Sequence, residues 1–253
     1  MTQALQYILN NWDQVLGRTQ EHLTLVFWAV GLAIFAGVPL GILITRDPRL
    51  ASPVLGFANV MQTVPALAFF GFLMPVAGIG RTTAIVVLFL YSLLPIIRNT
   101  YTGIKNVDPA LVEAARGMGL TDLQTLFMVQ LPLALPVIVV GVRVATVVSI
   151  GTATVAFLVG GGALGAIITR GLARGKDYIV FAGAAFAALL AIVADLALTW
   201  VERLLTPAGI RTPGGRRPRG RRQPMLASRS SARNTAAGVP TEEADGVHAS
   251  GDA

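Results

Sequence analysis

Five long apolar stretches, each with at most one charged residue, dominate this sequence. They cover residues 23–44, 50–77, 82–97, 133–168 and 178–201. An α-helix rises about 1.5 Å per residue, so the first stretch alone forms a helix of about 33 Å, which crosses the hydrocarbon core of a bilayer. With 54% apolar and only 13% charged residues, the chain is too apolar for a water-soluble domain of its length. We therefore predict an all-α integral membrane protein with five transmembrane helices.

Residues that carry most catalytic and metal chemistry are scarce. The chain has no cysteine, and His22 and His248 are its only histidines, so thiolate sites, histidine-rich metal sites and catalytic triads are not expected. The glycines and lysine of residues 171–177 are too closely spaced for a phosphate-binding loop, and Asp follows the lysine where Ser or Thr is needed. We expect no enzyme, no cofactor and no metal, and any ATP hydrolysis must come from a separate subunit.

Prolines and polar residues interrupt the second apolar stretch. Pro53, Pro65 and Pro75 lie in it, and Gln62 and Thr63 come just before the middle proline. Broken backbone at membrane depth is tolerated only against protein or along a water-filled route. Gln62, Thr63 and Pro65 are therefore candidates for lining a translocation path. A kink that serves only helix packing explains them equally well.

Tyr91 and Arg143 complete the set of path candidates. Arg143 lies about eleven residues inside the fourth stretch, where a cation is costly unless it faces the bundle interior, water or a partner group. A structural pairing or a contact between subunits is the other role that we consider for this arginine. The fourth helix should end near Val159, before the glycine-rich residues 160–165, and leave 166–177 as a short segment at the far surface.

A polar island at residues 105–131 separates the third and fourth stretches. Asp108 is placed as an N-cap with Pro109 in the first helical turn, which predicts a short helix at 109–117 that Gly117 and Gly119 end. Thr121 or Asp122 can cap a second short helix through Gln130, and Pro132 then opens the next apolar run. We expect a helix-turn-helix knob whose small residues Ala114 and Ala115 let another protein approach closely. The alternative is an ordinary amphipathic connector.

The two ends of the chain depart from the apolar pattern. Residues 1–22 are mixed and polar, and we expect an N-terminal interfacial segment before a membrane domain at 23–205. Residues 206–253 are rich in Pro, Gly, Ser and Arg, which predicts a disordered tail. Basic runs beside a membrane helix mark the cytoplasmic side and attract anionic lipid. We therefore expect membrane lipid as the tail's partner, no nucleic acid, an N-terminus outside and a C-terminus in the cytoplasm.

The island carries a spaced signature. Glu-Ala-Ala is followed after three residues by Gly, then after nine residues by an aliphatic residue, and after one more by Leu-Pro; the positions are Glu113, Ala114, Ala115, Gly119, Val129, Leu131 and Pro132. This pattern resembles the EAA signature of ABC-importer permeases, with Val129 in place of the usual Ile. The resemblance implies the type I importer permease fold, in which a cytoplasmic coupling helix docks on a dimer of ABC ATPase subunits. It also implies an extracytoplasmic binding protein, a second permease copy or a related permease, and alternating access in a bacterial cytoplasmic membrane.

Further segments narrow the resemblance. Residues 62–68, 88–103, 107–110, 141–146 and 151–154 are similar to permeases that import the osmoprotectants glycine betaine, carnitine or choline. The similarity covers roughly residues 20–205 and implies a role in osmotic stress, with the solute captured by the separate binding protein. Two alternatives stay open. One is the same architecture importing another small solute, such as an amino acid or a sulfonate. The other is an ATP-independent carrier or channel, for which buried carboxylates near the membrane midplane are expected.

Overall fold

The computed structural model describes residues 2–206, and within that range only helices and the turns between them occur. The elements in chain order are α1 (Thr2–Asn10), α2 (Trp12–Arg46), α3 (Pro48–Thr63), α4 (Ala66–Ala77), α5 (Arg81–Lys105), α6 (Pro109–Gly117), α7 (Asp122–Thr125), the π-helix η1 (Leu126–Gln130), α8 (Leu131–Ala153), the 3-10 helix η2 (Ala156–Val159), α9 (Gly165–Ala173) and α10 (Asp177–Leu205). The tail predicted at 206–253 lies, apart from Thr206, outside the described residues.

Four helices of the described part are long and apolar enough to cross a membrane. They are α2, α5, the continuous helix Asp122–Ala153 and α10. Helices α3 and α4 meet at a bend of 101° and make a fifth crossing if the pair is counted as one broken span. The all-helical membrane fold is confirmed, and the second apolar stretch is broken where Pro65 predicted it.

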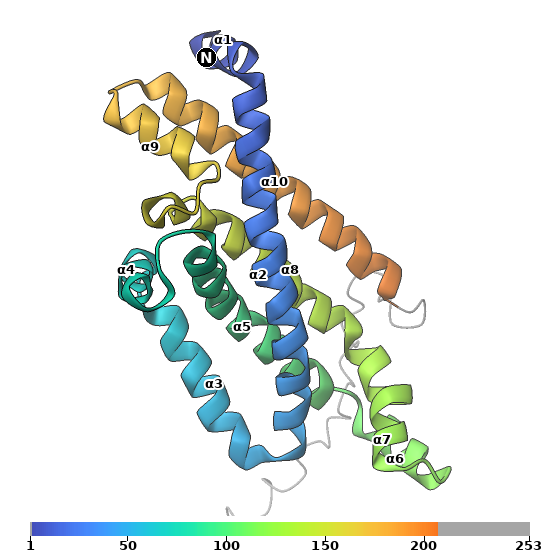
Figure 1. The fold of residues 1–253 in the computed structure, drawn as a ribbon. Helices are drawn as coiled ribbons and strands as arrows, with labels where there is room; N and C mark the ends of the chain where they lie inside the picture. The colour runs from blue at the N-terminus through green and yellow to red at the C-terminus, as the bar shows by residue number, and fades with distance from the viewer. Residues whose placement is uncertain (1, 207–253) are drawn as a thin grey trace, which may run out of the picture. The chain divides into compact units, whose positions relative to one another are not determined.

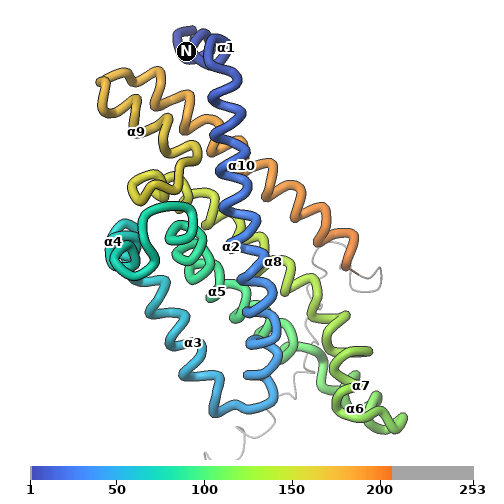
Figure 2. The backbone as a smooth tube through the Cα atoms, viewed as in Figure 1, coloured from blue at the N-terminus to red at the C-terminus, as the bar shows by residue number. Residues whose placement is uncertain are grey.

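Helix α5 forms the centre of the bundle. It packs most extensively against α2 and α8, and also contacts α3 and α4 (Figures 1 and 2). More than half of the apolar part of α5 is buried, whereas most of the apolar part of α10 is exposed. Polar groups also join the central helices: Ser92 Oγ and Ser149 Oγ lie 2.7 Å apart between α5 and α8. A hydrogen bond between these buried hydroxyls adds to the apolar packing of α5 against α8.

The first spanning helix begins earlier than its apolar stretch. Helix α2 starts at Trp12, so it runs without a break across the boundary that we placed between residues 22 and 23. Val15 is 1% exposed and packs with Leu164, Ile167 and Ile179. Packing against α9 and α10 therefore stabilises the polar start of this helix, a contact between distant segments that the local sequence does not reveal.

The fourth spanning helix also begins earlier than predicted. We expected a separate short helix through Gln130, but α7, η1 and α8 form one continuous helix from Asp122 to Ala153. Pro132 lacks a backbone N–H and its ring would clash with the carbonyl four residues before it. The chain widens to a π-helix over Leu126–Gln130 just before this proline, and such a local widening removes the clash without ending the helix.

A tight glycine-rich turn follows α8. The α-helix ends at Ala153 and η2 continues to Val159, the end that we predicted for the span. The chain then reverses through Gly160 and Gly162, whose φ angles are +77° and +73°. The backbone of α9 returns so close to the end of α8 that a Cβ on Gly165 would lie 1.8 Å from the Thr154 carbonyl oxygen. Helices α9 and α10 then pack together at the opposite end of the bundle from α6 and α7 (Figure 1).

Candidate functional site

The polar island folds into the predicted knob, which we define as residues 109–125. Helix α6 has the predicted bounds, and the Asp108 side chain accepts a hydrogen bond of 2.9 Å from the backbone N–H of Ala110. Gly119 follows its C-terminus with a φ of +88°, a conformation that favours glycine. Thr121 caps α7 in a reciprocal capping box with Gln124. The first helix and the turn of the predicted helix-turn-helix are confirmed, whereas the second helix continues through η1 into α8.

The signature residues divide into an exposed group and a packed group. Glu113, Ala114 and Gly119 are exposed on the knob. Ala115 is 1% exposed, and it lies on the side of α6 that packs within the knob, where α6 contacts α7 and η1. Of the two small residues of the signature, only Ala114 is exposed. The remaining positions are half-buried in the helix that follows: Val129, Leu131 and Pro132.

Asp122 ties the knob to the end of α2. Its carboxylate Oδ1 lies 2.9 Å from Arg116 Nη2, and its backbone carbonyl accepts a hydrogen bond of 2.9 Å from Arg46 Nη2. The sequence analysis missed this contact because Arg46 and Asp122 are 76 residues apart. The available signal was a basic residue in the last turn of a spanning helix, where the helix dipole also favours a cation.

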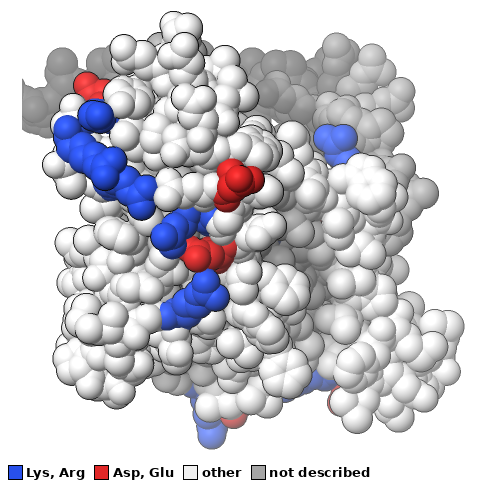
Figure 3. All heavy atoms as spheres, turned by 45° about the horizontal axis from the view of Figure 1, so that its top comes forward, with Lys and Arg blue, Asp and Glu red and all other residues white. Residues whose placement is uncertain are grey.

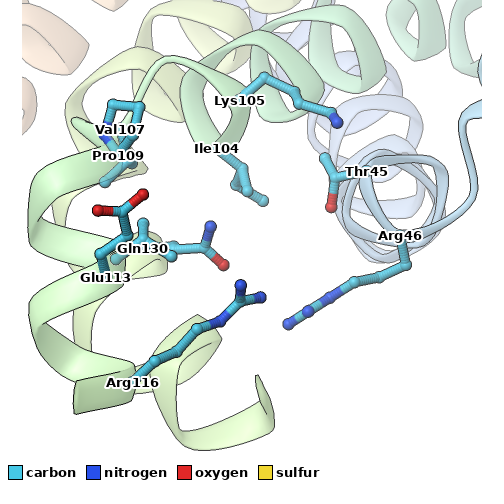
Figure 4. A pocket seen from close by; sticks show the side chains of 10 residues that line it. Thr45, Arg46, Ile104, Lys105, Val107, Pro109, Glu113, Arg116 and Gln130 are labelled. Atoms are coloured by element: carbon cyan, nitrogen blue, oxygen red, sulfur yellow. The ribbon is translucent and has the colours of Figure 1, made fainter. Parts of the chain in front are cut away.

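A cleft of about 330 Å³ lies between the knob and the ends of α2 and α5. Figure 4 shows the side chains of Arg46 and Arg116 pointing toward one another across it. The residues that line the cleft are Thr45, Arg46, Ile104, Lys105, Val107, Pro109, Val112, Glu113, Arg116 and Gln130. The lining thus has three basic side chains and one acidic one, and its surface is positive.

Four of the path candidates meet at the bend between α3 and α4. Val64 has extended backbone with φ −67° and ψ 127°, so its carbonyl leaves the helical hydrogen-bond ladder. The Tyr91 hydroxyl donates to this carbonyl from α5. Gln62 and Thr63 end α3, and Pro65 precedes the first residue of α4. The structure thus assigns Tyr91 a concrete role, because it satisfies a backbone acceptor that the broken helix leaves open.

Arg143, the fifth path candidate, lies apart from this bend and joins α8 to α10. Its Nε is 2.8 Å from Asp195 Oδ1, and its Nη1 is 3.2 Å from Glu202 Oε2 and 3.0 Å from Thr199 Oγ1. A cation inside a spanning helix needs partner groups, and these three side chains supply them for the guanidinium of Arg143. Since most of α10 is exposed, these bonds are important for holding it against α8.

We expect Arg143→Met to lower the free energy of unfolding by about 1–2 kcal/mol, because it leaves two carboxylates on α10 without their cation. Titration of the purified chain from mild detergent into a denaturing detergent measures this change. The double variant Arg143→Met, Asp195→Asn should recover part of the loss. Equal stability of wild type and Arg143→Met would contradict the assigned pairing.

Another charged cluster lies at the opposite end from the knob. Glu21 Oε2 is 2.8 Å from Arg18 Nη1 and accepts a hydrogen bond of 3.0 Å from the backbone N–H of Ala163, while Glu21 Oε1 is 3.3 Å from Arg81 Nη2. A cleft of about 480 Å³ adjoins the cluster. Figure 3 shows basic side chains, with a few acidic ones between them, on the face that comes forward at this end. The two ends of the bundle therefore each present a polar surface.

Comparison with known proteins assigns the family. Residues 37–207 match the family described as binding-protein-dependent transport system inner membrane component. The chain belongs to this family. It is therefore a multi-pass inner-membrane permease subunit of an ABC importer rather than an enzyme, and proteins of this family work with an ATPase and a binding protein.

Curated relatives match the permease over most of their length. It is 43% identical over 210 residues to the Bacillus subtilis choline transport system permease protein OpuBB, covering 83% of this chain and 97% of that one. It is 48% identical over 202 residues to the Bacillus subtilis glycine betaine/carnitine/choline transport system permease protein OpuCD, covering 79% and 88%. The Salmonella typhimurium osmoprotectant import permease protein OsmW is 45% identical over 213 residues, covering 82% and 99%.

Solved structures confirm the type I importer permease fold. A chain of the MetNI methionine ABC transporter in an inward-facing conformation matches with a TM-score of 0.70 at 24% identity, covering 77% of this permease and 97% of that chain. A chain of an amino acid ABC transporter matches with a TM-score of 0.63 at 19% identity, covering 79% and 96%. At such low identity these matches establish the fold and not the solute.

Proposed function

We propose that this permease forms the membrane path of an ATP-driven importer of quaternary-ammonium osmoprotectants. The observation that carries the proposal is the near full-length match, at 43–48% identity, to permeases named for choline, glycine betaine and carnitine. Transporters of amino acids share the fold at only 19–24% identity. That contrast favours quaternary amines over the alternative of an amino acid.

In the proposed orientation the knob lies in the cytoplasm and the N-terminus lies outside. Glu113, Ala114 and Gly119 face solvent on the knob, and two apolar side chains beside them, Met118 and Leu123, are 74% and 66% exposed. An exposed apolar surface with a polar rim is typical of a docking site. We assign it to the ATPase dimer. The charged end with Glu21 and Arg81 is then the surface that faces the loaded binding protein.

The structure suggests how movement of the knob reaches the membrane. Helix α7 continues through η1 into α8, so displacement of the knob by the closing ATPases acts directly on a spanning helix. The bonds of Asp122 to Arg116 and Arg46 connect the same displacement to α2. We propose that these two connections drive the change between inward-open and outward-open states. The path itself forms between this permease and a second copy or a related permease.

The test is uptake of labelled glycine betaine, carnitine and choline by cells that lack other osmolyte importers. The permease is expressed with its own ATPase and binding protein, and a matched strain carries an ATPase that cannot hydrolyse ATP. We expect uptake only with the active ATPase, reduced by unlabelled quaternary amines and unchanged by unlabelled amino acids. Uptake that amino acids suppress, or none from the assembled complex, would contradict the proposed solute class.

A further inference from the structure

Three helices each carry a basic residue in their last turn beside the same cleft. Arg46 lies in the last turn of α2, Lys105 in the last turn of α5 and Arg116 in the last turn of α6. All three side chains line the cleft between the knob and the two spanning helices (Figure 4). Segments far apart in the sequence thus bring their positive charges to one place.

The acidic groups nearby do not balance these charges. Asp122 pairs with Arg116 and offers Arg46 only a backbone carbonyl. Glu113 is the one acidic side chain of the lining. Among the described residues Lys105 has no ion-pair or hydrogen-bond partner for its side chain. The guanidinium groups of Arg46 and Arg116 point toward one another (Figure 4), and the single Asp122 carboxylate neutralises only one of these two charges. A further anion beside them would therefore be stabilised.

The geometry points to a binding site for a phosphate group, and we propose that the headgroup of an anionic phospholipid supplies it. Arginine binds phosphate oxygens through two parallel N–H groups, and lysine adds a point charge. Gln130 adds an amide that Figure 4 shows directed into the cleft. The volume of about 330 Å³ accommodates a headgroup phosphate.

The position of the cleft favours a lipid headgroup over a soluble ion as its ligand. It lies at the ends of α2 and α5, two helices that cross the membrane, and spanning helices end at the depth of the headgroups. Basic pockets between spanning helices on the cytoplasmic side are known to take anionic headgroups. The choice of the cytoplasmic leaflet rests on the orientation proposed above, whereas the presence of a phosphate site does not.

A bound headgroup would also link the knob to the bundle. Its phosphate would lie between Arg116 on α6 and the basic residues at the ends of α2 and α5, so it would supplement the link that Asp122 makes. The anionic lipid content of the membrane would then influence how firmly the knob is held.

Native mass spectrometry of the full-length chain in neutral detergent tests the site. The chain is titrated with phosphatidylglycerol and, separately, with zwitterionic phosphatidylcholine. We expect phosphatidylglycerol to bind more tightly, and Lys105→Gln to weaken it about fivefold, the effect of one basic residue near an anionic headgroup. Lys105→Arg should retain the affinity. Arg49→Gln is the matched control, because Arg49 is an exposed basic residue at the start of α3 and does not line the cleft.

Inorganic phosphate distinguishes the two sources of the anion. If millimolar phosphate displaces phosphatidylglycerol from the wild-type chain, soluble phosphate is the ligand and the assignment to lipid is overturned. If it does not displace the lipid, the headgroup is the ligand. Equal phosphatidylglycerol binding by Lys105→Gln and Arg49→Gln would overturn the proposal. Because no uptake is measured, this result is independent of whether the permease imports osmoprotectants.

Discussion

Uptake by the Gly119→Trp permease should fall to background while the amount of protein in the membrane stays unchanged. Gly119 is exposed beside the C-terminus of α6 and a Cβ placed on it meets no atom within 4 Å. The chain can therefore fold around the indole, which then projects from the knob surface assigned to the ATPase. A large side chain in a closely packed protein interface prevents docking. Labelled glycine betaine uptake and a membrane-fraction immunoblot measure the two quantities.

The Gly119→Ala variant separates the effect of side-chain size on uptake from the effect of backbone strain. The φ of +88° disfavours any residue with a Cβ, by about 1–2 kcal/mol, so the alanine variant carries the same strain as the tryptophan variant. We expect it to retain most of the uptake. Normal uptake by Gly119→Trp would contradict the docking role of the knob. If Gly119→Ala is as inactive as Gly119→Trp, backbone strain rather than side-chain size causes the loss of uptake.

Gly165→Ala should prevent the permease from reaching its folded state in useful amounts. The added Cβ would lie 1.8 Å from the carbonyl oxygen of Thr154, which is backbone and cannot rotate away as a side chain would. Overpacking typically costs about 1–3 kcal/mol and more where the backbone must shift. We expect a strongly reduced yield of monodisperse protein in detergent, and a melting temperature lowered by several degrees in what is recovered.

Gly151→Ala is the matched control for this steric effect. Gly151 lies in α8 and has no atom within 4 Å of an added Cβ. Alanine at a helical position is favoured over glycine by about 1 kcal/mol, so this variant should be as stable as wild type or slightly more stable. Equal melting temperatures for Gly165→Ala and Gly151→Ala would contradict the close approach of Gly165 to the Thr154 carbonyl.

Local signals in the sequence were sufficient to predict α6 and the turn that follows it. Asp108 and Pro109 start α6 through interactions within a few residues, and Gly119 lies just beyond its end in a backbone conformation that glycine favours. The break at Pro65 was predictable for the same reason, since proline alters the backbone at its own position. The spacing of the family signature then located the knob within the chain and indicated the importer permease fold.

Contacts between distant segments could not be predicted in this way. The early start of α2 depends on packing of Val15 against α9 and α10, and the link from Arg46 to Asp122 joins two helices far apart in sequence. Burial of Ala115 was missed because the signature gives spacing and does not say which side of α6 packs inward. The pairing of Arg143 with α10 was one of two roles left open, and only the structure names its partners.

In the proposed mechanism the continuous helix from Asp122 to Ala153 would act as a lever. Its 32 residues extend about 48 Å at 1.5 Å per residue, so a tilt of about 10° around its midpoint would move each end by about 4 Å. One end carries the knob and the other leads into the tight turn before α9. A small rotation imposed at one membrane surface would thereby be delivered as a displacement at the other, and the π-helical segment Leu126–Gln130 lies at the knob end of this helix.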